Sequence, residues 1–311
     1  MAYEARVVAD SVSENGYRLT TLEVCFPRFV LAEFNTHRVF SRNSASSRAI
    51  PVHKQLERIM TDPFVPVYWG EHQKGMQALR EAGITTRVRS QKEWLLARDA
   101  AVAHVEKLLS FDLHKQIPNR LLEPFMWHTV LVTSTEWSNF YALRANADAQ
   151  PEIQVAAELM KEVYVDSNPQ IVHDSEWHKP LIQDDELEWA AENETDAVRV
   201  SAARSARLSY MTHNNVRDTD EDLKMFSRLE EGGHMSPFEH VARPISTDEW
   251  RMRKLAQNAA KRSAQRASSS VESRTLMQFV DAMEFDGNLR GWHPYRKDMP
   301  YESDFSLRPV G

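Results

Sequence analysis

Two alternating segments joined by an Asn-Gly dipeptide constrain the start of this fold most strongly. Residues 4–10 and 17–26 both alternate between apolar and polar side chains, as strands with one buried face do. Asn15 and Gly16 lie between them, and this dipeptide is typical of the tight turn of a β-hairpin. The sequence therefore predicts an antiparallel hairpin, and residues 30–34 are expected to extend its second strand.

Helices are expected through much of the next part of the chain. A capping-box pattern begins at Ser90, and apolar residues at helical spacing behind it predict a long helix. The apolar run 128–133 predicts another strand, and a second capping-box pattern at 133–136 predicts a helix from there to about Arg144. Asp148 is expected to cap the helix after that, with Pro151 in its first turn and one apolar face, formed by Ile153, Ala156, Ala157, Met160 and Val163. This mixture predicts an α+β fold, with a small, mostly antiparallel sheet and several long helices.

Two further helices are expected towards the end of the chain. Residues 219–231 are followed by Gly232 and Gly233, which commonly stop helices. Residues 248–285 also have a helical pattern, and within them 261–274 is rich in Ser and Arg.

Composition narrows the classes of function. The 311 residues carry a net charge of −7, which argues against wholesale binding of a nucleic-acid backbone. The glycine patterns of a Rossmann fingerprint and of a Walker loop are both missing from the sequence. No run approaches the ~18 apolar residues of a membrane span, and the N-terminus does not resemble a signal peptide. With Cys25 as its single cysteine, the chain is expected to be cytoplasmic and free of internal disulfides.

The segment 36–48, THRVFSRNSASSR, combines hydroxyl and amide donors with three arginines and contains no acidic residue. A phosphate dianion needs several donors that converge on one point, and hydroxyls, backbone N–H groups and guanidinium forks supply them. The segment follows an apolar strand and precedes a helical region near Val52, a junction at which anions bind readily. We interpret it as a phosphate-binding loop; a Ser-rich surface turn is the alternative.

The order of residues in this segment resembles a known signature. THRVFSRNSASSR is similar to the RHRxxSxNExSxR signature of flavin-dependent thymidylate synthases. The matching positions are His37, Arg38, Ser41, Asn43, Ser46 and Arg48. Thr36 replaces the first arginine of the signature, Ser44 replaces its glutamate, and Glu33 stands where the family has glutamine.

Other stretches resemble the same family. NRLLEP, with Arg120, is similar to ARxxLP, and NFYALRANADAQPE, with Arg144, is similar to NFLxLRxxxxAQxE. ARLSY (206–210) and HMSPFEH (234–240) resemble ARVSY and HxSPFEH. In the family these last two motifs precede the signature, whereas here they follow it. The sequence therefore resembles a circularly permuted member, in which 234–240 would pack beside 36–48.

The resemblance implies roles for the matched residues at the phosphate end of a nucleotide. Ser46 and Arg48 would hold the 5′-phosphate of the substrate, with help from Ser44, Ser47 and backbone N–H groups. Arg120 would join them from a neighbouring subunit.

At the base end, Arg144 would contact the pyrimidine and stabilise negative charge on the ring, which makes C5 nucleophilic. A salt bridge from Arg144 to Asp148 or Glu152 is the alternative. Six residues would contact the flavin, namely His37, Arg38, Asn139, His234, Ser236 and Glu239. A metal site is not expected, because His234 and His240 are six positions apart with no cysteine nearby.

The reaction that the resemblance implies moves a one-carbon unit from methylenetetrahydrofolate to C5 of dUMP. NADPH would reduce FAD, and reduced flavin would complete the methyl group of dTMP. Because the departures from the signature lie near flavin, sugar and phosphate, dCMP as substrate and a hydroxymethyl product stay open. Cys25 lies in an alternating strand and is expected to be a core residue rather than a nucleophile.

Two hypotheses from other classes accompany this one. The first is a flavin- or nucleotide-binding relative without catalysis. The second is a nucleic-acid-binding module built on 261–274, which the acidic balance and the lack of interleaved aromatic residues disfavour.

For domain organisation, we expect one intertwined catalytic domain over 1–311. Residues 1–165 would supply the hairpin, the signature and several helices, and 166–195 would be a linker. Residues 196–311 would supply the permuted motifs and a C-terminal extension, of which the last 65 residues match no part of the family pattern. The resemblance also implies a homotetramer with sites shared between subunits.

Overall fold

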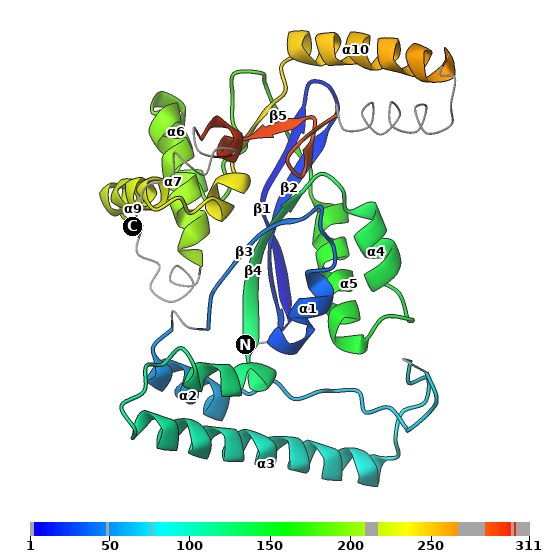
Figure 1. The fold of residues 1–311 in the computed structure, drawn as a ribbon, viewed down its shortest axis with the longest axis vertical. Coiled ribbons are helices and arrows are strands. Elements are labelled where there is room, and N and C mark those ends of the chain that lie inside the picture. The colour runs from blue at the N-terminus through cyan, green and yellow to red at the C-terminus, as the bar shows by residue number, and fades with distance from the viewer. Residues whose placement is uncertain are drawn as a thin grey trace.

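A five-stranded sheet forms the centre of the molecule (Figure 1), with the strand order β3-β4-β2-β1-β5. The computed structural model describes residues 3–47, 50–75, 77–208, 217–266, 284–299 and 302. β1 (Glu4–Ser13) and β2 (Arg18–Pro27) form the expected hairpin. Gly16 has a φ of +81° in the turn, a conformation that glycine adopts without steric cost.

Three strands complete the sheet. β4 (Trp127–Ser134) pairs antiparallel with β2 and with β3 (Ser41–Ser44). β5 (Gln170–Val172) pairs with β1 in parallel at the other edge. The predicted α+β class and the mostly antiparallel sheet are therefore confirmed, and so is the strand expected over 128–133.

The described helices lie around the sheet in four places (Figure 1). One group lies beside it and comprises α1 (Leu31–Phe34), α4 (Ser138–Arg144) and α5 (Pro151–Asp166). A second group comprises α6 (Leu187–Glu192), α7 (Glu194–Ala206) and α9 (Thr219–Glu231). The pair α2 (Val52–Thr61) and α3 (Ile84–Leu109) lies at one end of the molecule and α10 (Thr247–Arg266) at the other.

The two faces of the sheet differ in chemistry. On one face, alternate residues of β2 and β4 form the main apolar core with the helices α4 and α5. These strand residues are Leu22, Val24, Phe26, Val130 and Val132. The buried residues of α5 include Ile153, Ala156 and Met160, which confirms the predicted apolar side of that helix.

The other face of the sheet carries a buried polar network. The Nδ1 atom of His178 lies 2.8 Å from Oγ of Ser11, and its Nε2 lies 2.8 Å from Oγ1 of Thr21. Thr21 in turn contacts Thr133 at 2.6 Å, and Thr133 lies 2.8 Å from Nδ1 of His240. Buried polar groups need such partners, so this network ties the C-terminal half to the hairpin.

The strand extension predicted over 30–34 is wrong. Residues 28–30 form a short 3-10 helix, η1 (Arg28–Val30), and α1 follows directly. Val30 and Phe34 are buried whereas Ala32 is exposed, which fits a helical turn and not the alternation of a strand.

The expected starts of three helices are also wrong. α3 begins at Ile84 after Gly83, because no helix breaker separates Gly83 from the pattern at Ser90. α4 begins at Ser138, since 133–134 still belong to β4. α5 has Gln150 and not Asp148 at its N-cap, and Pro151 occupies the first turn as expected.

The C-terminal predictions are confirmed in part. α9 covers 219–231, and α10 covers 247–266 of the helix expected up to residue 285. Residues 267–283 lie outside the described residues, and Phe285 belongs to a short strand, β7 (Phe285–Asp286). Residues 166–195, expected to be a linker, contribute β5, α6 and the buried side chain of His178.

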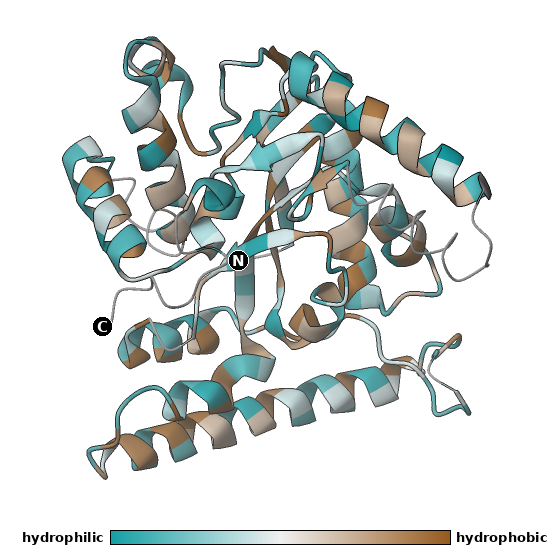
Figure 2. Cartoon of the chain, turned by 45° about the horizontal axis from the view of Figure 1, so that its top comes forward, coloured by the Kyte–Doolittle hydropathy of each residue, from teal (hydrophilic) through white to brown (hydrophobic). Residues whose placement is uncertain are grey.

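The long helices α3 and α10 carry hydrophobic and hydrophilic residues along their whole length (Figure 2). No helix in the described part of the chain is long and apolar enough to cross a membrane.

Candidate active site around β3

The segment predicted as a phosphate loop is a loop only at its two ends. Its centre, Ser41–Ser44, is β3, with Ser41 opposite Thr133 and Ser44 opposite Val130 of β4. The prediction of a continuous loop is therefore wrong, because a neighbouring strand provides backbone partners that the segment's own sequence does not reveal. Arg48, a predicted phosphate ligand, lies outside the described residues.

Arg144 lies at the end of α4 and reaches the turn before β3. Its Nε donates to Nε2 of His37 at 3.1 Å, and its Nη2 donates to Oγ1 of Thr36 at 3.2 Å. The imidazole of His37 packs edge-on against Phe140, with ring centroids 4.9 Å apart. Burial lowers the pKa of His37, and the positive charge of Arg144 lowers it further. The imidazole is therefore neutral near pH 7 and can accept from the guanidinium.

The alternative interpretation of Arg144 as a salt-bridge residue is wrong. Among the ion pairs of the described residues, none joins Arg144 to Asp148 or Glu152. Glu152 instead accepts from Gln150 at 3.0 Å.

The HMSPFEH motif packs beside β3, as the permuted order of motifs predicted. Its residues form the 3-10 helix η4 (Ser236–Glu239). Oγ of Ser236 donates to Oδ1 of Asn43 at 3.1 Å, and Nδ2 of Asn43 donates to the carbonyl of Ser205 at 2.5 Å. Two motifs that are nearly 200 positions apart in sequence therefore meet at one strand.

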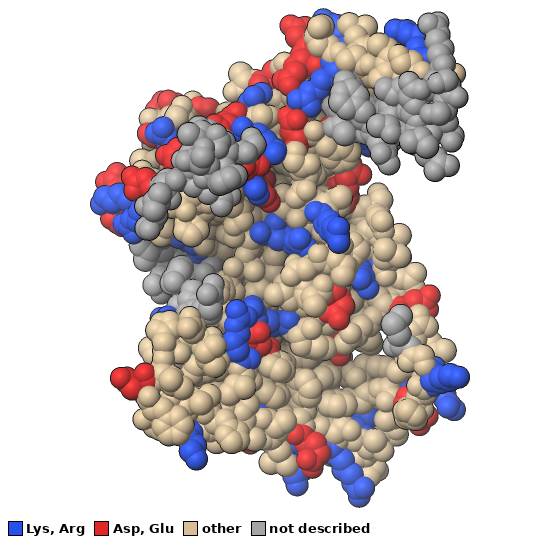
Figure 3. Space-filling view, in the orientation of Figure 1, with Lys and Arg blue, Asp and Glu red and all other residues tan. Residues whose placement is uncertain are grey.

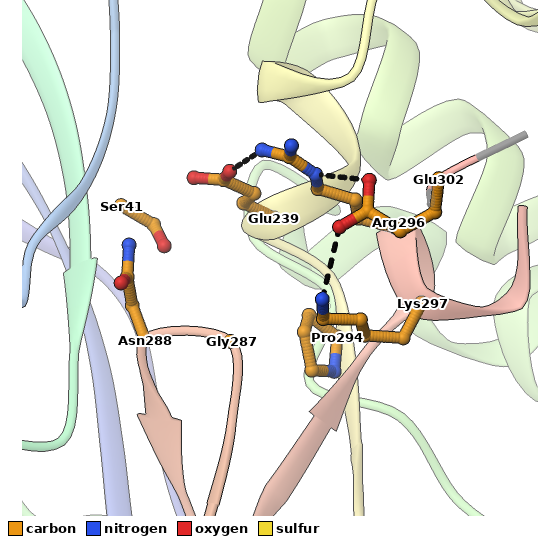
Figure 4. Close-up of a pocket in the computed structure, with 8 residues that line it drawn as sticks. All are labelled: Ser41, Glu239, Gly287, Asn288, Pro294, Arg296, Lys297 and Glu302. Carbon is orange, nitrogen blue, oxygen red and sulfur yellow. Dashed lines mark hydrogen bonds and ion pairs between the residues drawn. The ribbon is translucent and has the colours of Figure 1, made fainter. Parts of the chain in front are cut away.

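A polar pocket of about 230 Å³ opens where β3, η4 and the C-terminal segment meet. The residues that line it are Ser41, Glu239, Gly287, Asn288, Pro294, Arg296, Lys297 and Glu302 (Figure 4). Arg296 forms an ion pair with Glu239, and its Nε donates to Glu302 at 2.7 Å. Lys297 also donates to Glu302, at 2.9 Å. The pocket is thus walled on one side by charged groups held in place by one another.

A second cluster lies where the signature segment ends. Ser47, Arg28 and Arg120 all contact the carboxylate of Glu123, which belongs to the 3-10 helix η2 (Pro118–Phe125). Burial opposes ionisation of Glu123, but the hydrogen bond from Ser47 and the charges of Arg28 and Arg120 lower its pKa. Two residues predicted to bind phosphate, Ser47 and Arg120, are therefore brought together here within one chain, whereas the resemblance implied that Arg120 would come from a neighbouring subunit.

The remaining predicted site residues make fewer contacts. Arg38, Ser44, Asn139 and His234 are exposed, and Ser46 is half-buried. Asn139 precedes Phe140, which touches the ring of His37, so it lies on the same side of β3 as Arg144.

Several residues of the two clusters were not anticipated. Asn288 and Arg296 lie in the stretch GNLRGWHPYRKDMP, which matched no family pattern although its density of polar residues and glycines was visible. No local sequence pattern marked Arg28 or Glu123, because their contact depends on the packing of η1 against η2.

In the face shown in Figure 3, basic and acidic side chains both occur across the middle of the molecule. In the described part of the chain, no group of three or more His, Cys, Asp or Glu side chains could hold a metal ion.

Residues 17–170 match the family model of the thymidylate synthase complementing protein. No curated protein sequence matches the chain.

Among solved structures, the chain resembles a UMP/dUMP methylase, PolB, from Streptomyces cacaoi, crystallised with 5-Br UMP. That resemblance has 15% sequence identity and a TM-score of 0.44, and it covers 53% of this chain and 89% of PolB. Residues 17–170, which contain the signature segment, Arg120 and Arg144, therefore form a domain of the flavin-dependent thymidylate synthases, a family of enzymes.

Proposed function

We propose that this protein transfers a one-carbon unit from methylenetetrahydrofolate to C5 of a pyrimidine deoxynucleotide monophosphate, with dUMP converted to dTMP. The observation that carries the proposal is the meeting of three distant motifs at β3. Arg144 reaches His37 on one side, Ser236 reaches Asn43, and Ser47 shares Glu123 with Arg120. Family membership through residues 17–170 supports the same chemistry.

Arg144 is the residue that we propose for activation of the base. Two of its N–H groups are committed to His37 and Thr36, which fixes the plane of the guanidinium. The remaining N–H groups can then face the pyrimidine and stabilise negative charge that develops on its ring. A neutral His37 is important here, because a protonated ring could not accept from Nε of Arg144.

The residues around β3 fit a flavin in donor type. We propose that His37, Arg38 and Asn139 would hold it on the Arg144 side, and that His234, Ser236 and Glu239 would hold it on the η4 side. Glu239 is held in position by Arg296, so its carboxylate is fixed at the pocket wall. When bound, FAD that NADPH has reduced would supply the hydride that completes the methyl group.

At the other end of the substrate, we propose that Ser44, Ser46, Ser47, Arg48 and Arg120 bind the 5′-phosphate. Ser47 and Arg120 already converge on one carboxylate oxygen, which supports the binding of an anion at this place.

The permuted order of motifs and the single catalytic domain are part of the proposal. The network from Ser11 through His178, Thr21 and Thr133 to His240 supports both, because it buries residues of both halves against each other. A homotetramer in the cytoplasm completes the proposal.

The test is to purify the protein, record its visible spectrum, and incubate it with NADPH, methylenetetrahydrofolate and either dUMP or dCMP. We expect a flavin spectrum. We also expect a product from dUMP that is heavier by one CH2 unit, because a methyl group replaces the hydrogen on C5. A product from dCMP, or a hydroxymethyl product, would change the assigned substrate or reaction. A flavin spectrum without NADPH oxidation would favour the non-catalytic relative.

A matched pair of variants tests the role of Arg144. Arg144→Gln should abolish turnover, whereas Arg89→Gln, in the exposed part of α3, should leave it unchanged. Equal activity of the two variants would contradict the proposed role of Arg144.

A further inference from the structure

Three donors converge on a single carboxylate oxygen at the end of the signature segment. Oε1 of Glu123 accepts from Oγ of Ser47 at 2.7 Å and from Nη1 of Arg120 at 2.8 Å. Nη2 of Arg28 lies 3.1 Å from the same oxygen. One hydroxyl and two guanidinium groups around one anionic oxygen are the arrangement of a built anion site.

The donors of this cluster are held firmly. Ser47 is fully buried, and its carbonyl accepts from Nδ2 of Asn119 at 2.7 Å, so the end of the signature is tied to η2. The side chain of Arg28 is 10% exposed, and its Nη1 lies 3.0 Å from Nδ1 of His128. Burial and the charge of Arg28 lower the pKa of His128 to about 3, so this imidazole is neutral and adds no positive charge.

The charge balance of the cluster decides what it can bind. Arg28 and Arg120 carry two positive charges, and Glu123 already cancels one of them. A phosphate monoester near pH 7 carries between one and two negative charges, so it would match the two arginines if Glu123 were neutral. With Glu123 ionised, an incoming phosphate is repelled by the carboxylate. It also competes with the carboxylate for the N–H and O–H donors around it.

We propose that Glu123 is a specificity-determining residue of this site: in the ligand-free protein its carboxylate occupies the anion position and thereby lowers the affinity for a nucleoside monophosphate. Glu123 stands where the related motif ARxxLP has leucine, and an apolar residue there would leave the three donors open to the ligand. The inference deepens the proposed function, because it rests on Ser47 and Arg120 as parts of the phosphate end of the site.

The test compares the wild-type protein with Glu123→Gln, which keeps the size of the side chain and removes its charge. Dissociation constants for dUMP, deoxyuridine and inorganic phosphate are measured by calorimetry at one pH and one ionic strength. Since one like charge within a few ångströms of the phosphate is removed, we expect Glu123→Gln to bind dUMP about tenfold more tightly or better. The affinity for deoxyuridine, which has no phosphate, should not change.

Two further variants make the comparison specific. Glu81→Gln removes another carboxylate that is paired with an arginine, Arg87, at 2.6 Å, and it should leave the affinity for dUMP unchanged. Adding Arg120→Gln to Glu123→Gln should cancel most of the gain, because the phosphate then lacks one of its donors. If Glu123→Gln does not fold, as judged by circular dichroism, Glu123→Leu serves as the second neutral variant.

The measured affinities for dUMP and inorganic phosphate either support or overturn the inference. A folded, neutral variant that binds dUMP and inorganic phosphate no more tightly than the wild-type protein overturns the inference. Tighter binding of inorganic phosphate by Glu123→Gln, with no binding of dUMP by either protein, supports the role of Glu123 and refutes dUMP as the substrate.

Discussion

Three histidines that are buried in the neutral form predict a loss of stability in mild acid. His128, His178 and His240 are 3%, 1% and 0% exposed, respectively. Burial lowers the pKa of each to about 3, with a further contribution from Arg28 at His128 and from His178 at His240. In an unfolded chain the pKa of histidine is about 6.5. Between pH 3 and pH 6.5 the unfolded state therefore binds protons at these histidines, whereas the folded state does not.

The sign and size of the effect follow from proton linkage. Because the unfolded state binds more protons, the stabilising contribution of these histidines is fully present above pH 6.5. The free energy of unfolding then falls as the pH falls towards 3. Each histidine contributes a slope of about 1.4 kcal/mol per pH unit in this window. Lowering the pH from 6.5 to 5 therefore costs about 2 kcal/mol for each histidine and about 6 kcal/mol for the three together. That is a large share of the roughly 5–15 kcal/mol that stabilises a typical domain.

Several other shifted groups act outside this window. The pKa values of Glu284 and Asp286 are lowered to about 2, so their stabilising effect is lost below about pH 4. Hydrogen bonding to Asp286 raises the pKa of His293, so its contribution is present below pH 6.5 and is lost as the pH rises through the raised value. In the interval from pH 6.5 to 5 the three buried histidines therefore act together with His37, whose pKa burial also lowers.

The measurement is urea unfolding, followed by circular dichroism, at several pH values between 7.5 and 4.5. His178→Gln should reduce the slope against pH by about 1.4 kcal/mol per pH unit, because one titrating group is removed. His104→Gln, on the exposed side of α3, should leave the slope unchanged. A free energy of unfolding that is the same at pH 7 and pH 5, or an unchanged slope in His178→Gln, would refute the reasoning.

Three substitutions test other parts of the structure. Cys25→Ala should leave turnover nearly unchanged, because Cys25 lies buried in β2 and burial raises the pKa of its thiol; an inactive but folded variant would count against a mechanism without an enzymic cysteine. Thr133→Val removes the hydroxyl between Thr21 and His240 and should cost about 1–3 kcal/mol of unfolding free energy, measured in urea, and a cost near zero would show that the network is not needed. Arg296→Gln releases Glu239 at the pocket wall and should raise the KM of the flavin or nucleotide more than it lowers kcat; unchanged kinetics would place the pocket outside the site.

Local sequence patterns were reliable where one element follows from its own residues. The hairpin followed from alternation and from Asn15-Gly16, and the buried side of α5 followed from apolar residues at helical spacing. The family also followed from the order of residues within its motifs, which requires no knowledge of the structure. Patterns failed at element ends, since caps depend on which neighbour competes for the backbone, as at Ser90 and Asp148.

The candidate site was predictable as a set of residues but not as an arrangement. Residue order marked His37, Arg144 and Ser236, and each lies near β3 in the structure. The salt-bridge alternative for Arg144 was compatible with helical spacing, and the structure excludes it because Arg144 contacts His37 and Thr36 instead. Arg296 carried no signal, because its importance depends on Glu239, which is 57 positions away.

The sequence by itself determined the periodic elements, the impossibility of a disulfide within a chain that has one cysteine, and the family to which residues 17–170 belong. Only the tertiary structure decided that the centre of the predicted phosphate loop is a strand, that HMSPFEH packs against it, and that Ser47, Arg28 and Arg120 converge on Glu123. The physical reason is the separation in sequence over which each kind of interaction acts. Periodicity and turn chemistry depend on neighbours within a few residues, whereas strand pairing, buried hydrogen bonds and converging charges depend on contacts between residues far apart in the sequence.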